Sequence, residues 1–129
     1  MATIQKFEDI KVWQKARAIC KDVFEITESK EFQDDFRFKH QIKSSSGSIM
    51  DNIAEGFERG GRKEFIQFLG FAKGSSGELR SQLIRAYDQN YIDKKTFDKM
   101  NQEAMEVGKM IMGFIDYLKK SKIQGQKFD

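Results

Sequence analysis

Hydrophobic side chains recur at alternating spacings of three and four residues in four long stretches of the 129-residue chain. This spacing places apolar side chains on one face of an α-helix, so it predicts four amphipathic helices. We expect them at about residues 8–28, 34–59, 62–90 and 94–121. The most regular apolar seam belongs to the fourth stretch and consists of Phe97, Met100, Ala104, Val107, Ile111, Phe114 and Leu118.

Two segments rich in serine and glycine, SSSGS (44–48) and KGSSGE (73–78), have the composition of flexible linkers. The apolar period nevertheless passes through the first without a change of phase, from Ile42 to Ile49, and it passes through the second in the same way. We therefore interpret both as helical, with the linker as the alternative. Small side chains there would let the second and third helices approach closely, although serine and glycine weaken each helix in isolation.

Short connections join the predicted helices. They are SKEFQ (29–33), GG (60–61) and NYID (90–93). Asp34 or Asp35 is a suitable N-cap for the second helix, and Asp93 is suitable for the fourth, because an aspartate side chain can accept hydrogen bonds from unpaired helix N–H groups. Long helices with tight turns predict an all-α fold, an up-down-up-down antiparallel four-helix bundle.

The composition fits one globular domain, with 39% hydrophobic and 33% charged residues and no proline. We place the bundle at residues 7–121, between an N-terminal tail (1–6) and a flexible, basic C-terminal tail (122–129). No apolar run approaches the roughly 20 residues of a membrane span, and the first residues lack the plan of a signal peptide. We therefore expect a cytoplasmic protein without membrane contact.

The segment NIAEGFERGGRKEF (52–65) combines a glycine pair with charged residues and raises the question of a phosphate-binding loop. A loop of that kind requires G-x-x-x-x-G-K-[ST] after a strand, and neither the spacing nor the strand is present. Gly60 and Gly61 instead suit the end of a helix. Three cations and three carboxylates balance locally, and Glu55 and Arg59 have the spacing of an i,i+4 ion pair. We expect a helix corner.

Side chains for enzyme chemistry are scarce. His40 is the single histidine, and position 37 lacks the glutamate that a Glu-x-x-His metal motif of helical bundles would need. Cys20 is the single cysteine and lies beside the apolar seam of the first helix, where an inert core thiol is expected. We expect no metal, no cofactor and no enzymatic activity.

Basic side chains offer a better prospect of function, because the net charge is +3 and some cations have few acidic neighbours. Pairs of cations share one helical face and suit phosphate contacts, although a merely solvated face is the alternative. The candidates for nucleic-acid binding are Lys39, Lys43, Arg59, Arg62, Lys63, Lys73, Arg80 and Arg85.

Polar residues also flank the seams of the second and third helices. They are Gln41, Asn52, Glu55, Glu78 and Gln82. We expect a hydrogen-bonded network between the two helices, which would fix their register or an oligomer geometry. A catalytic carboxylate pair is the sharper alternative.

Apolar residues exceed what one inner seam requires. The additional pairs are Met50 with Phe57, Met105 with Met112, and Phe68 with Phe71. Second apolar stripes indicate either a wide core or a subunit interface. With 12 phenylalanines in the chain, we favour self-association.

The motif NIAEG (52–56), followed by Arg59, belongs to a pattern that runs over about residues 7–118. Its other positions are Phe7, DIKVWQKA (9–16), Gln41, Ile42, Ser48, Ile49, Glu64, Phe65, Phe68, Leu69, Ala72, Gly74, Ser75, Glu78, Leu79 and Gln82. In this pattern the chain resembles the four-helix-bundle protein family encoded in intervening sequences of bacterial large-subunit ribosomal RNA genes.

Two departures from the family pattern stand out. The family often has a proline after the phenylalanine that precedes the second helix, whereas Gln33 follows Phe32 here. It often has two adjacent basic residues after Gln-Ile, whereas Lys43 is followed by Ser44. The second departure weakens the argument for nucleic-acid contacts at that place.

The resemblance implies a bundle that assembles as a ring-shaped homopentamer. Related accessory proteins of diversity-generating retroelements share the fold, bind nucleic acid through basic surfaces and associate with a reverse transcriptase. The leading hypothesis is therefore an oligomeric, non-enzymatic protein that binds RNA or DNA. The alternative is a protein-interaction scaffold or accessory subunit, which the near balance of 23 basic and 20 acidic residues keeps open.

Overall fold

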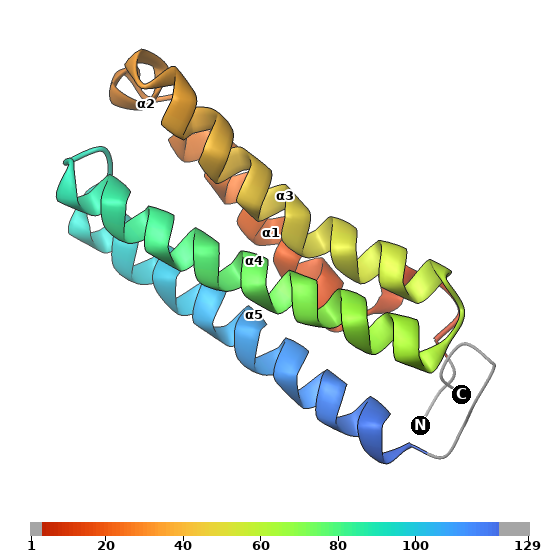
Figure 1. The fold of residues 1–129 in the computed structure, drawn as a ribbon. Helices are drawn as coiled ribbons and strands as arrows, with labels where there is room; N and C mark the ends of the chain where they lie inside the picture. Colours follow the sequence, from red (N-terminus) through yellow and green to blue (C-terminus); the bar gives the residue numbers. More distant parts are fainter. Residues whose placement is uncertain (1–3, 122–129) are drawn as a thin grey trace.

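The computed structural model describes residues 4–121, and in this part of the chain all regular structure is helical. The elements are a 3-10 helix, η1 (Phe7–Asp9), and the α-helices α1 (Lys11–Ile26), α2 (Lys30–Asp34), α3 (Phe36–Glu58), α4 (Arg62–Asp88) and α5 (Lys94–Lys120). Consecutive long helices run antiparallel, and α3 and α5 each pack against both α1 and α4 (Figure 1). This arrangement is a helical bundle, as predicted. The predicted C-terminal tail (122–129) lies outside the described residues.

The predicted apolar seams meet in one core. Ile49 of α3, Leu79 of α4 and Ile111 of α5 are fully buried, and Ala16 of α1 joins them. Seam residues near the bundle ends, such as Phe114, are partly buried and pack against this core. Between residues 4 and 121, no helix is both long and apolar enough to span a bilayer.

The two segments rich in serine and glycine are helical, and the linker alternative is wrong. Residues 44–48 lie within α3 and residues 73–78 within α4. Ser46 and Ser76 are buried, and each hydroxyl donates a hydrogen bond to a backbone carbonyl of its own helix, at 3.0 and 2.7 Å. The Ser75 hydroxyl donates to the Ser48 oxygen at 3.0 Å and links the two helices.

Helices α3 and α4 approach closely at Gly56, in the NIAEG motif. A Cβ atom at this position would lie 2.5 Å from the Cβ of Phe68 and 3.1 Å from the ring of Phe65. Real Cβ atoms do not come so close, so only glycine allows this separation of the helices. Phe57, next in sequence, is fully buried, and its ring meets that of Phe65 edge to face at 6.0 Å. Of the two alternatives for the second stripe, a wide core therefore holds at Phe57, because α4 covers it.

The N-terminal part is more finely divided than predicted. The expected helix at 8–28 is split by Ile10, which is buried in an extended conformation between η1 and α1. The expected link at 29–33 contains the short helix α2, which the Ser29 side chain caps by accepting from the N–H of Phe32 at 3.4 Å. Phe32 is fully buried and packs against the rings of Phe38 and Tyr91. Burial of this one side chain explains why the connection folds as a helical turn.

Aspartate and glycine define the helix ends. Asp35, rather than Asp34, caps α3 by accepting from the N–H of Phe38 at 3.3 Å, and it also accepts from the Tyr91 hydroxyl at 2.8 Å. Asp93 caps α5 as predicted, accepting from the N–H of Thr96 at 2.8 Å. Gly60 follows the end of α3 with φ of 82°, a conformation that favours glycine.

We expect Gly56→Ala to lower the free energy of unfolding by about 1–3 kcal/mol, because the added methyl group would push α3 and α4 apart. Gly47→Ala is the matched control, since it lies in the same helix and a Cβ there meets nothing within 4 Å. We expect the control to raise stability by up to about 1 kcal/mol through helix propensity. Urea unfolding followed by circular dichroism measures both. Equal effects of the two substitutions would contradict the close-approach interpretation.

The Asp93 cap makes stability depend on pH. The hydrogen bond from Thr96 lowers the pKa of Asp93 below its ordinary value of 3.8, so folding favours the ionised carboxylate. This contribution is fully present above the unfolded pKa and is lost as the pH falls through the folded pKa. In Asp93→Asn the amide oxygen still caps but does not titrate. We expect the stability advantage of the natural chain over this variant to shrink from about pH 5 to about pH 3. An advantage that stays constant across this range would contradict the assignment.

Candidate nucleic-acid interface

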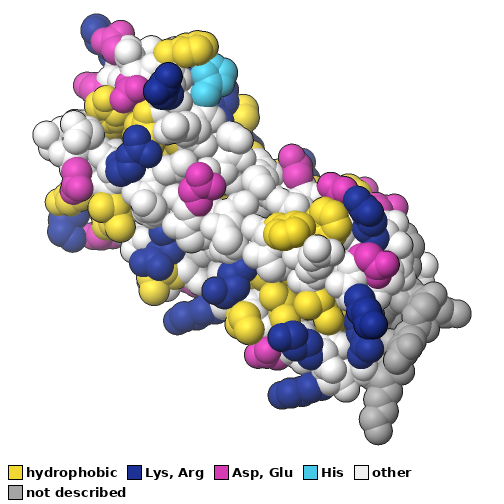
Figure 2. All heavy atoms as spheres, viewed as in Figure 1, with side chains coloured by type: hydrophobic (Ala, Val, Ile, Leu, Met, Phe, Trp, Pro, Cys, Tyr) yellow, Lys and Arg dark blue, Asp and Glu magenta, His cyan; other side chains and the backbone are white. Residues whose placement is uncertain are grey.

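Basic side chains are spread over the surface, but on one face they border an apolar strip along the junction of α4 and α5 (Figure 2). Here the two helices form an open groove of about 340 Å³, which we call the basic groove. Its lining residues are Lys73, Ser76, Gly77 and Arg80 from α4, and Ala104, Met105, Gly108, Lys109 and Met112 from α5. It combines two features that the sequence suggested separately, the Lys73 and Arg80 pair and the Met105 and Met112 stripe.

The basic groove holds three cations and no lining carboxylate. Lys73 and Arg80 come from α4, seven residues apart, which corresponds to about 10 Å along the helix. Lys109 comes from α5, on the opposite wall. The Arg80 Nε donates to the Asn101 Oδ1 at 3.1 Å, so the guanidinium is held in place by a neutral partner. A groove that is lined by three cations, one of them held in position, suits phosphate groups.

Two of the three cations of the helix corner, Arg59 and Arg62, are already engaged in the fold. The Arg59 Nη2 donates to the Glu55 Oε2 at 2.8 Å, as the spacing predicted, and its guanidinium lies 4.9 Å from the centre of the Phe68 ring. Arg62 donates through Nη1 to the carbonyl of Leu118 at 3.4 Å and to that of Ser121, at the C-terminus of α5. These contacts satisfy free carbonyl groups of α5. Lys63 is exposed at the start of α4.

The remaining candidates lie apart from the basic groove. On the side of α3 that faces α1 and α2, the Lys43 ammonium lies 4.2 Å from the ring centre of Phe24, and the Lys39 Nζ donates to Gln33 at 2.9 Å. The Arg85 guanidinium lies 4.4 Å from the ring centre of Phe38. The structure thus divides the eight candidates among several surfaces and brings Lys73 and Arg80 together with Lys109.

A second, polar groove of about 430 Å³ lies between α3 and α4. Its lining residues are His40, Gln41, Ser44, Ser45, Ser48, Glu78, Gln82 and Arg85. Three members of the predicted polar network, Gln41, Glu78 and Gln82, therefore share one groove. Asn52 and Glu55 bond within α3 instead, to Ser48 and Arg59. The Oε1 atom of Gln82 is buried without a hydrogen-bond partner among the described residues.

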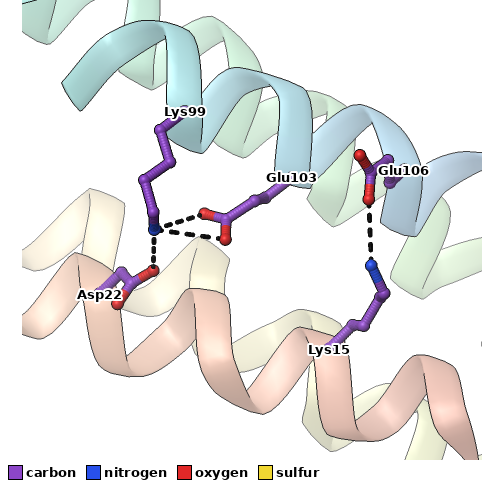
Figure 3. Close-up of polar contacts among 5 residues, drawn as sticks. All are labelled: Lys15, Asp22, Lys99, Glu103 and Glu106. Carbon is purple, nitrogen blue, oxygen red and sulfur yellow. Dashed lines mark hydrogen bonds and ion pairs between the residues drawn. The ribbon is translucent and has the colours of Figure 1, made fainter. Parts of the chain in front are cut away.

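The junction of α1 and α5 carries ion pairs that the sequence analysis did not anticipate (Figure 3). Lys15 contacts Glu106 at 3.0 Å, and Lys99 contacts Asp22 at 3.2 Å and Glu103 at 3.3 Å. The hydrogen bonds to Asp22 and Glu103 raise the pKa of Lys99, and the hydrogen bond from Lys15 lowers the pKa of Glu106. On this face, cations are neutralised by carboxylates, in contrast to the basic groove.

Sequence reasoning missed Lys109, which lines the basic groove, and Asn101, which holds Arg80 beside it. Sequence spacing relates cations only within one helix, and it does not show that α4 packs against α5. The spacing did hold a signal, because Lys109 follows Met105 by four residues and precedes Met112 by three, and so shares their helical face. In the part of the chain that the structure describes, no three His, Cys, Asp or Glu side chains group to hold a metal ion.

Comparison with known proteins shows a similar fold and a family match. One solved structure, a protein of unknown function from the S23 ribosomal protein family of Bacteroides thetaiotaomicron, superimposes with a TM-score of 0.74. The match covers 81% of this chain and 97% of that chain at 23% sequence identity. A search of curated proteins gave no match. The family model described as "23S rRNA-intervening sequence protein" matches residues 8–113. The chain belongs to the 23S rRNA-intervening sequence protein family.

Proposed function

We propose that this protein binds RNA or DNA without enzymatic activity and that it contacts phosphate groups through Lys73, Arg80 and Lys109 of the basic groove. The proposal is based on one observation: three cations, and no carboxylate, line the same groove. The setting that we propose is the cytoplasm, in keeping with the free thiol of Cys20.

The distribution of ion pairs supports this choice of surface. Lys15 and Lys99 face carboxylates across the α1–α5 junction, and Arg59 faces Glu55 within α3. A phosphate approaching those cations would compete with a carboxylate that is already bound. In the basic groove no carboxylate lines the walls beside Lys73 and Lys109, and a phosphate would meet an Arg80 that Asn101 already orients. The family name refers to 23S rRNA, which makes RNA the first nucleic acid to test.

We expect the double variant Lys73→Glu, Arg80→Glu to weaken RNA binding strongly and to reduce the slope of log affinity against log salt by about 1.5, because two phosphate contacts are lost. The variant Lys11→Glu, Lys21→Glu carries the same change of charge on exposed positions of α1 and is the matched control. Fluorescence anisotropy across a salt series measures both. An unchanged slope in the groove variant, or equal losses in both variants, would remove the basic groove from the proposal.

A second candidate function is a scaffold or accessory subunit that binds another protein, such as a reverse transcriptase. Exposed apolar side chains on α4 favour it, since Phe71 is 50% and Ile84 is 44% exposed. Such side chains cost solubility unless a partner covers them. A pull-down from the native cell after nuclease treatment separates the two functions. Stoichiometric recovery of one protein supports the scaffold, and loss of all bound material supports nucleic-acid binding.

We also propose that the protein is a homo-oligomer, with a ring-shaped pentamer as the form to test. Phe68 and Phe71 support it, because their rings meet edge to face at 5.5 Å and leave an aromatic edge on α4 that nothing in the described chain covers fully. An interface on this edge would bury Phe71.

We expect light scattering at micromolar concentration to give a mass well above the 15.0 kDa of one chain, and Phe71→Ser to lower it because the aromatic anchor is lost. Phe24→Ser, at an exposed aromatic position on α1, is the control and should leave the mass unchanged. A clean monomer of the natural chain would contradict self-association.

A further inference from the structure

We infer that the nucleic acid bound by the basic groove is single-stranded and that an unpaired base lies on the thioether side chains of Met105 and Met112. This inference rests on the proposed function and adds the class of nucleic acid. It follows from the combination of an apolar floor and flanking cations in one groove.

The floor of the groove is apolar and consists of Ala104, Met105 and Met112. Ala104 is buried at its base, Met105 is half-buried, and Met112 is 39% exposed. Methionine is soft and polarisable, and its sulfur makes favourable contacts with aromatic rings. An exposed apolar floor of this kind gains free energy when a flat ring covers it.

Two glycines keep the floor open. Gly77 of α4 and Gly108 of α5 line the groove on opposite walls. A Cβ at Gly77 would meet nothing within 4 Å, so the space beside this residue is empty. A Cβ at Gly108 would lie 3.4 Å from the Ser76 hydroxyl, in ordinary contact. The volume of about 340 Å³ falls at the lower end of the ~300–1,000 Å³ typical of ligand pockets.

The cations lie where the backbone of a strand would pass. Lys73 and Arg80 mark the two ends of the α4 wall, and Lys109 lies on the α5 wall between Met105 and Met112. The contacts of Arg80 Nε with Asn101, and of the Asn101 amide with the Met105 sulfur at 3.9 Å, join one cation to the floor. A ligand that fills this groove therefore presents anionic groups and a flat apolar face within about 10 Å of each other.

A single strand meets this requirement and a duplex does not. In a duplex the base faces are stacked on one another, so it offers phosphates and base edges but leaves the methionine floor uncovered. In a single strand the base faces are free, and aromatic or apolar surfaces beside a positively charged groove bind them with little sequence preference. An acidic amphipathic helix has the right charge, but its diameter of roughly 10–12 Å exceeds what a groove of this volume holds.

The test uses the full-length protein and three probes at about 50 mM salt: a 12-nucleotide single-stranded RNA, the duplex of the same sequence, and a 20-residue acidic amphipathic peptide. Gly77→Leu fills the groove and leaves every cation in place. Gly70→Leu is the matched control, because Gly70 also lies in α4 and a Cβ there meets nothing within 4 Å. Circular dichroism checks that both variants fold.

We expect the natural chain to bind the single strand about tenfold more tightly than the duplex, the size expected for one stacked base. Gly77→Leu should remove this preference, and Gly70→Leu should keep it. Equal binding of both nucleic acids, unaffected by Gly77→Leu, would overturn the single-strand inference and leave the proposed function standing. Binding of neither would overturn both. Binding of the peptide alone, abolished by Gly77→Leu, would assign the groove to a protein partner.

Discussion

The close approach of α3 and α4 at Gly56 is the constraint on which the rest of the structure depends. With no side chain at this position, the backbone of α3 lies against Phe68, and Phe57 and Phe65 pack edge to face beside it. Further along, buried Ser45 of α3 and the hydrogen bond between Ser48 and Ser75 continue this contact. Helices of poor intrinsic propensity are thus held by packing.

This packing decides which surfaces are left for function. Because the small residues of α4 occupy two faces of the helix, Ser75 meets α3 while Gly77 borders α5. The absence of a side chain at Gly77 leaves a groove along α4 and α5, and the cations of both helices border it. Along α1 and α5 the same kind of junction is closed by carboxylates, through Glu106 and Asp22. The two junctions therefore differ in charge: carboxylates pair with cations along α1 and α5, whereas cations alone line the groove between α4 and α5.

The sequence was sufficient to predict the four long helices, because the apolar period shows directly which side chains are buried. It was sufficient also for the continuity of α4 through residues 73–78, since the phase of Ala72 and Leu79 outweighed the local composition. It did not predict α2, because this short helix has a single buried side chain, Phe32, and a periodic pattern requires several apolar residues. For a related reason it could not decide whether Phe57 lies in a wide core or at a subunit interface, because its contact with Phe65 in the first turn of α4 is a tertiary contact. The groove required knowledge of which helix faces meet, so Lys109 could not be joined to Lys73 and Arg80 from spacing alone.

The most direct measurement is a titration of the protein, labelled with carbon-13 at the methionine methyl groups, with single-stranded RNA in the NMR spectrometer. The chain has six methionines, and Met105 and Met112 are those that line the basic groove. We expect these two resonances to shift in a saturable way while that of Met50, on α3, stays in place. Shifts at Met50 without shifts at Met105 and Met112 would contradict it.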